Sequence, residues 1–123
     1  MKAALMVFLG GGLGSVFRYL ITKFIIQTEH SLPLGTFTVN IIGSLILGFI
    51  LGLSLKNNYL SNNTVLFLAT GFCGGFTTFS TFAFENQNLL RSGDYINFAL
   101  YAFGSILVGI LAVSVGLYFS KLI

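Results

Sequence analysis

Long stretches without a charged side chain constrain this sequence more than any other feature. Three runs of 26, 28 and 26 residues and a shorter run of 15 contain no charge. About 20 apolar residues are enough for one helix to cross the hydrocarbon core of a bilayer. Each longer run therefore predicts a crossing. The charged residues that bound the four runs are Lys2, Arg18, Glu29, Lys56, Glu85, Asp94 and Lys121.

The predicted fold is an all-α membrane protein with four transmembrane helices in a single domain, residues 1–123. Only 7% of the residues are charged, whereas a soluble domain carries about 25%. A soluble fold of this size could not bury so much apolar surface. Turn and polar residues separate the runs and place the helices near residues 3–26, 36–55, 64–90 and 95–120.

The six Lys and Arg residues predict insertion in two orientations. Four helices put the N-terminus, the second loop and the C-terminus on one side of the membrane. Lys/Arg asymmetry between loops sets orientation, and here each side carries three cations, so both orientations are expected. Two oppositely inserted copies could then form an antiparallel homodimer. The cations of the two sides are Lys2, Lys56 and Lys121, and Arg18, Lys23 and Arg91.

Small residues recur at four-residue spacing within the predicted helices. In lipid, such pairs let two helix backbones approach closely, so they predict tight helix packing. Four pairs follow this pattern: Gly10 and Gly14, Gly48 and Gly52, Ser105 and Gly109, and Ala112 and Gly116.

A break is expected in the third helix, near the middle of the membrane. Gly74 and Gly75 each weaken a helix by about 1 kcal/mol relative to Ala. Thr77 and Thr78 can bond to nearby backbone and disfavour a regular ladder further. A broken helix is tolerated in a membrane only where it is buried in protein or lines a polar cavity, and its freed carbonyls can coordinate a cation.

Phenylalanines recur every three residues after this break, at Phe76, Phe79 and Phe82. Hydroxyl residues stand beside them, including Ser80 and Thr81. One interpretation is an aromatic stripe that packs in lipid. The other uses the electropositive edge of the phenyl ring, which together with hydroxyl donors could host a small desolvated anion.

Asn40 is a polar residue within the second predicted helix, and an amide in a membrane is costly unless it is bonded. Either it joins two helices or it belongs to a polar path. Thr36 and Ser44 share its face at four-residue spacing, and Tyr101 and Ser105 are four apart on the last helix. Neutral donors from three helices could thus form one track.

Charged groups inside the predicted helices are rare. Arg18 is the one ionised residue well inside an apolar stretch, where it either anchors the helix end at the interface or raises the local anion concentration. No acidic residue lies deep in a helix, and Glu85 comes nearest. A proton-coupled transporter needs a titratable group within the membrane, so the sequence does not favour that class of protein. No hydrolytic set, metal cluster or basic nucleic-acid face is apparent, so we expect neither an enzyme nor a nucleic-acid partner.

Three segments carry a resemblance to a known family: GGLGSVFRY (residues 11–19), TVNIIGS (38–44) and GFCGGFTTFSTF (71–82). They resemble the signatures of the CrcB/Fluc family of fluoride channels, and the resemblance covers the whole chain in length and helix count. The resemblance implies an antiparallel, dual-topology homodimer in a microbial cell membrane. It also implies two pores that export toxic fluoride from the cytoplasm passively.

The resemblance further implies roles for individual residues. A structural sodium ion at the dimer centre would be held by the backbone carbonyls of Gly74 and Thr77. Arg18 would face a vestibule. The pore would be lined by Asn40, by the phenylalanines Phe79 and Phe82, and by the hydroxyl residues Thr36, Ser80, Thr81, Tyr101 and Ser105.

Two other classes of membrane protein compete with this interpretation. Small multidrug antiporters also have four helices and often a dual topology, but their chemistry needs a carboxylate in the first helix, and residues 3–26 contain none. A structural membrane subunit without transport is the second alternative. Fluoride efflux from vesicles that hold only this protein would exclude it.

Overall fold

The computed structural model describes residues 1–25, 32–56 and 59–123, and all regular structure in these ranges is helical. Four helical segments are long and apolar enough to cross a membrane: α1 (Lys2–Phe24), α2 (Leu34–Ser54), the segment Asn62–Arg91, and α6 (Tyr95–Leu122). These bounds confirm the four predicted helices to within about two residues. The predicted end of the first helix, at residue 26, lies outside the described residues.

The segment Asn62–Arg91 is built from four successive pieces. It begins with α3 (Asn62–Val65), widens into the π-helical η1 (Leu66–Cys73), and returns to a short α4 (Gly74–Phe76) before α5 (Phe79–Arg91). The predicted break is present and falls at Thr77 and Thr78, while Gly74 and Gly75, which also favoured it, stay helical. Both threonines are extended, with φ/ψ of −82°/158° and −149°/118°.

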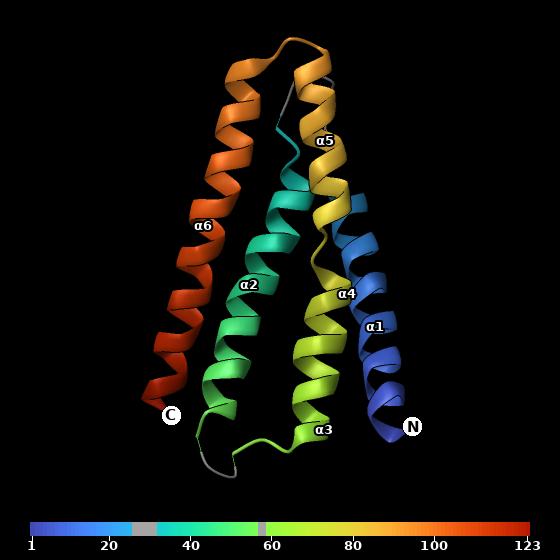
Figure 1. Cartoon of the computed structure of the whole chain (residues 1–123), viewed down its shortest axis with the longest axis vertical. Helices are drawn as coiled ribbons and strands as arrows, with labels where there is room; N and C mark the ends of the chain where they lie inside the picture. The colour runs from blue at the N-terminus through green and yellow to red at the C-terminus, as the bar shows by residue number, and fades with distance from the viewer. Residues whose placement is uncertain (26–31, 57–58) are drawn as a thin grey trace.

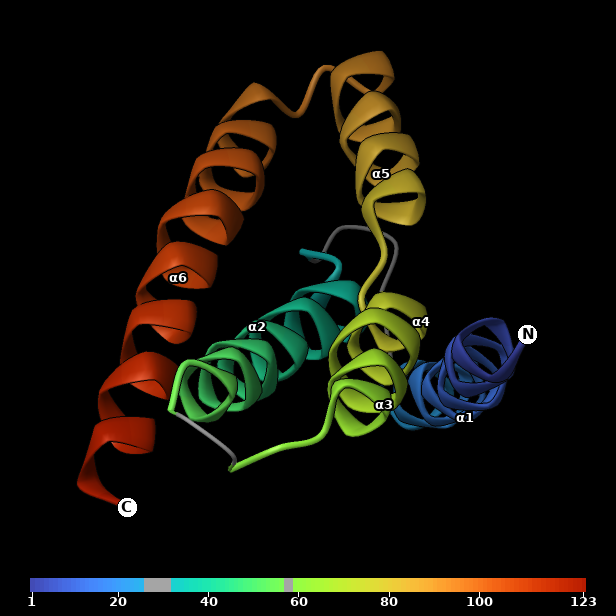
Figure 2. The same ribbon diagram turned by 60° about the horizontal axis from the view of Figure 1, so that its bottom comes forward.

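The helices pair in two tight contacts. α2 packs mainly on α6, and α1 packs mainly on η1 and α4. Figure 1 shows α2 and α4 between the two outer helices, and Figure 2 shows α5 leaning away from α4 after the break. Both chain termini lie at the same end of the molecule as α3 (Figure 1). This is the arrangement that four crossings require.

Glycines explain how closely α1 approaches the broken segment. A Cβ on Gly10 would collide with the Phe67 carbonyl oxygen, and one on Gly14 would collide with that of Phe72. From the other side, a Cβ on Gly75 would collide with the Gly11 carbonyl oxygen. Gly75 therefore allows the two backbones to pack closely. It remains helical because this contact with α1 outweighs the low intrinsic helix propensity of glycine.

The α2–α6 contact uses the same device and confirms two more of the predicted pairs. A Cβ on Gly48 would meet the Val113 carbonyl oxygen, and one on Gly116 would meet that of Leu45. The pair of Ser105 and Gly109 behaves differently. A Cβ on Gly109 would have open space around it, since its nearest neighbour is Ser44 Oγ at 4.0 Å. This pair faces a groove and not a helix.

Candidate functional site

The helix break is fixed by the side chain of Asn40, which projects from α2. Its Nδ2–H donates to the Thr78 carbonyl oxygen at 3.2 Å, and its Oδ1 accepts from the Thr78 N–H at 2.8 Å. One amide thus bonds both the N–H and the carbonyl oxygen of the residue at the break. Of the two predicted roles for Asn40, joining helices is the one that its hydrogen bonds describe.

Thr78 also begins the helix that follows. Its Oγ1 accepts from the N–H of Thr81 at 3.4 Å and donates to the Thr81 hydroxyl at 3.1 Å, as an N-cap residue does. The backbone of Thr78 is therefore held by α2 while its side chain caps α5. We did not single out Thr78 as a site residue from the sequence, although a threonine directly before a helix is a capping signal.

A groove on one side of the break collects several predicted pore residues. We call it the phenyl groove; its volume is about 290 Å³. The rings of Phe79 and Phe82 lie 5.9 Å apart there, and Phe82 stands 5.1 Å from the ring of Tyr101. The lining residues are Asn40, Ile41, Ser44, Leu47, Thr77, Thr78, Phe79, Phe82, Ser105, Ile106 and Gly109.

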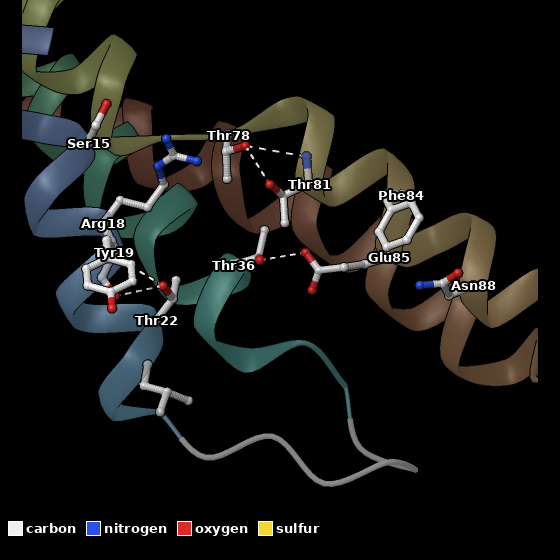
Figure 3. Close-up of a pocket in the computed structure, with 11 residues that line it drawn as sticks. Ser15, Arg18, Tyr19, Thr22, Thr36, Thr78, Thr81, Phe84, Glu85 and Asn88 are labelled. Atoms are coloured by element: carbon white, nitrogen blue, oxygen red, sulfur yellow. Dashed lines mark hydrogen bonds between the residues drawn. The ribbon is translucent and has the colours of Figure 1, made fainter. Parts of the chain in front are cut away.

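A larger cavity of about 720 Å³, the Arg18 cavity, lies on the other side of the break. It is lined by Ser15, Arg18, Tyr19, Thr22, Ile25, Thr36, Thr78, Thr81, Phe84, Glu85 and Asn88. Figure 3 shows these side chains converging from α1, α2 and α5. Thr78 lines both this cavity and the phenyl groove. The residue that Asn40 holds therefore stands between them.

Glu85 is a site residue that the sequence-based prediction left out. Its Oε1 accepts a hydrogen bond of 2.5 Å from the Thr36 hydroxyl, and it lines the Arg18 cavity (Figure 3). Its position as the acidic residue nearest the third apolar run was the available signal. The partner Thr36 lies 49 residues away in sequence, so the pairing could not be read from spacing.

Arg18 points toward the break. Its Nε–H donates to the Gly75 carbonyl oxygen at 3.1 Å, and the Ser15 hydroxyl reaches the same oxygen at 3.5 Å. Arg18 also lines the large cavity, as its predicted vestibule position requires.

The remaining predicted residues differ in their surroundings. Tyr101 is buried, and the Tyr101 and Ser105 hydroxyls have no hydrogen-bond partner among the described residues. Buried hydroxyls in this condition can accept a new partner. Ser80 is exposed and lines neither the phenyl groove nor the Arg18 cavity, and the Phe79 side chain is 79% exposed. Both lie on a face that one copy of the chain leaves open.

The break also frees backbone carbonyls. In a continuous helix, Gly74 would accept from the N–H of Thr78 and Thr77 from that of Thr81. Those two N–H groups donate instead to Asn40 Oδ1 and Thr78 Oγ1. Within residues 1–25, 32–56 and 59–123 no cluster of three His, Cys, Asp or Glu could bind a metal. Carbonyl oxygens are therefore the ligands that this site can offer.

The family model and the relatives found by comparison each match nearly the whole chain. The family described as "CrcB-like protein, Camphor Resistance (CrcB)" matches residues 5–117. The chain is 45% identical to the "Fluoride-specific ion channel FluC" of Azobacteroides pseudotrichonymphae genomovar. CFP2, over 94% of both chains. It is 47% identical to the protein of that name from Phocaeicola vulgatus, over 98% of this chain and all of the relative. Identity to the Bacteroides fragilis (strain YCH46) protein is 49%, over 98% of both.

Proposed function

The chain belongs to the CrcB-like family, and we propose that it is a passive, fluoride-selective channel that exports toxic fluoride from a microbial cytoplasm. Its place in this family and its four apolar helices make it a multi-pass microbial membrane protein and not an enzyme. The antiporter alternative loses its basis, because the family is one of ion channels and α1 carries no carboxylate.

One observation carries the proposal: Thr78, at the helix break, lines both the phenyl groove, whose lining is uncharged, and the Arg18 cavity, in which hydroxyl groups accompany Arg18 and Glu85. A fluoride ion that leaves water needs replacement hydrogen bonds. Hydroxyl groups of Thr81 and Ser105 and the edges of Phe79 and Phe82 can supply them without a full positive charge, and Thr36 would join them when its hydroxyl turns from Glu85 to the ion. Asn40, Ser80 and Tyr101 complete the proposed lining. The path would run from the Arg18 cavity past Thr78 into the phenyl groove.

An antiparallel homodimer with two pores would complete this path. Phe79 is largely exposed in the single chain, and a Cβ on Gly74 would meet nothing, so this face can receive a second copy. The even division of Lys and Arg supports the opposite orientation of the two copies. A two-fold dimer is the commonest assembly.

The dual topology can be tested by charge. Additional lysines in the loop between α2 and α3 should drive most chains into one orientation and reduce fluoride flux. Co-expression with a second version, biased the other way, should restore flux. Unchanged flux from chains that all point one way would rule out the antiparallel dimer.

Sodium is the proposed structural ion at the dimer centre. The Gly74 and Thr77 carbonyls fit it, because both have lost their helical donors and hard cations prefer oxygen ligands. Bound there, the cation would hold the two breaks together by neutralising their carbonyl dipoles. Replacing sodium by N-methylglucamine should then weaken the dimer, which light scattering of the purified protein would detect. Identical association in both solutions would remove the ion from the proposal.

Fluoride efflux from reconstituted vesicles tests the function, with chloride as the comparison ion. The chain should carry fluoride without an added proton gradient and carry chloride far more slowly. Phe82→Ile removes the electropositive ring edge but leaves an apolar side chain at this position. We therefore expect flux to fall at least about tenfold while the dimer still forms. Phe8→Ile, at an exposed α1 position away from both cavities, is the matched control. Normal flux in both Phe79→Ile and Phe82→Ile would exclude the rings from the mechanism.

A further inference from the structure

We propose that Arg18 supports conduction chiefly as a positioning residue, whose Nε–H fixes the Gly75 carbonyl at the helix break, and not by attracting the anion with its charge. The inference rests on the proposed channel function. It gives the Nε atom of Arg18 a structural task, to hold the Gly75 carbonyl, in addition to the expected position of Arg18 in a vestibule.

The Gly75 carbonyl needs an external donor. In a continuous helix it would accept from the N–H of residue 79, but the chain leaves the helix at Thr77 and a new helix starts at Phe79. An unsatisfied carbonyl at the end of a helix is costly where water is scarce. The Arg18 Nε–H answers this need at 3.1 Å, and a charged donor makes the stronger kind of hydrogen bond.

One face of α1 is built around this carbonyl. Gly11, Ser15 and Arg18 follow one another at spacings of four and three residues, so they lie on the same side of the helix. The backbone of Gly75 lies against that of Gly11, since a Cβ on Gly75 would collide with the Gly11 carbonyl oxygen. Ser15 and Arg18 then both reach the Gly75 oxygen. Close approach and donor supply therefore come from a single surface.

The position of this contact links Arg18 to the rest of the site. Gly75 lies between Gly74 and Thr77, whose carbonyls have lost their helical donors. On the far side of the break, Asn40 holds Thr78 from α2. The break is thus held from both sides, by α1 at Gly75 and by α2 at Thr78. If Gly75 were released, the direction of its neighbouring carbonyls and the position of Thr78 would both lose a constraint.

Two substitutions separate the donor from the charge. Arg18→Gln keeps an amide N–H at the place along the side chain that Nε occupies, and it removes the charge. Arg18→Lys keeps the charge, places a methylene at that point and carries its ammonium one bond further out. A positioning role predicts that Arg18→Gln retains fluoride efflux within about threefold of the wild type, while Arg18→Lys loses more than about tenfold. Flux of Arg18→Lys equal to or above that of Arg18→Gln would overturn the inference.

A second measurement uses the unaltered chain, so it does not depend on how the variants fold. Raising an inert salt at constant fluoride and sodium shortens the Debye length from about 30 Å at 0.01 M to about 3 Å at 1 M. A hydrogen-bonding role predicts that flux stays within about twofold, whereas attraction by charge predicts a steep fall. A steep fall contradicts the inference. Absence of any fluoride flux in the wild type would instead reject the channel function itself.

Discussion

Asn40→Asp should abolish fluoride flux and lower the thermal stability of the protein. An aspartate keeps the acceptor for the Thr78 N–H but loses the donor to the Thr78 carbonyl, so two oxygens would face each other where a 3.2 Å hydrogen bond stood. A carboxylate inside a membrane helix adds about 2.5–3.5 kcal/mol if it stays charged. We expect flux to fall by about a hundredfold or more, measured by efflux from vesicles.

The control for this substitution changes an amide to an acid elsewhere on the site-forming helices. Gln87→Glu lies on α5, at an exposed position that lines neither cavity, and should leave flux within about twofold of the wild type. Asn40→Leu then separates the effect of charge from that of lost bonds. It removes both hydrogen bonds without adding a charge, so it should also conduct poorly. Normal conduction by Asn40→Leu would show that the Thr78 contacts do not support the pore.

The sequence predicts the helices of this protein better than the contacts between them. The charge-free runs locate the four crossings, because the cost of a charge in lipid is set by composition and not by neighbours. The contacts of Arg18 with Gly75 and of Thr36 with Glu85 join residues 57 and 49 positions apart. Such pairs depend on how each helix is rotated about its axis. A membrane helix is apolar on all its faces, so its sequence has no amphipathic pattern from which that rotation could be predicted.

The two glycines at the break illustrate the limit of intrinsic propensity. Gly74 and Gly75 weaken an isolated helix, and with Thr77 and Thr78 they predict a break in this stretch. In the structure they remain helical, because α1 presses against Gly75 and the chain departs only where Thr77 and Thr78 find other bonds. Packing decided which residues stay helical, and polar partners decided where the helix ends.

Gly116→Ala should destabilise the protein more than alanine at either of the other glycines of α6, Gly104 or Gly109. A Cβ at this position would collide with the Leu45 carbonyl oxygen and come within 2.7 Å of the Phe49 nitrogen. These are backbone atoms, so relief requires α2 and α6 to separate. Overpacking of this kind costs about 1–3 kcal/mol, and occasionally more. We expect a clearly lower midpoint of thermal unfolding in detergent, together with reduced flux, since α6 carries Tyr101 and Ser105.

Gly104→Ala is the matched control on the same helix. A Cβ there has no neighbour within 4 Å, so the same chemical change should leave the unfolding midpoint equal or slightly higher. The difference between the two variants isolates the close approach of the backbones from the general effect of alanine on a helix. Equal midpoints for Gly104→Ala and Gly116→Ala would contradict the account. In that case the contact between α2 and α6 would have to be looser than the positions of Gly48 and Gly116 indicate.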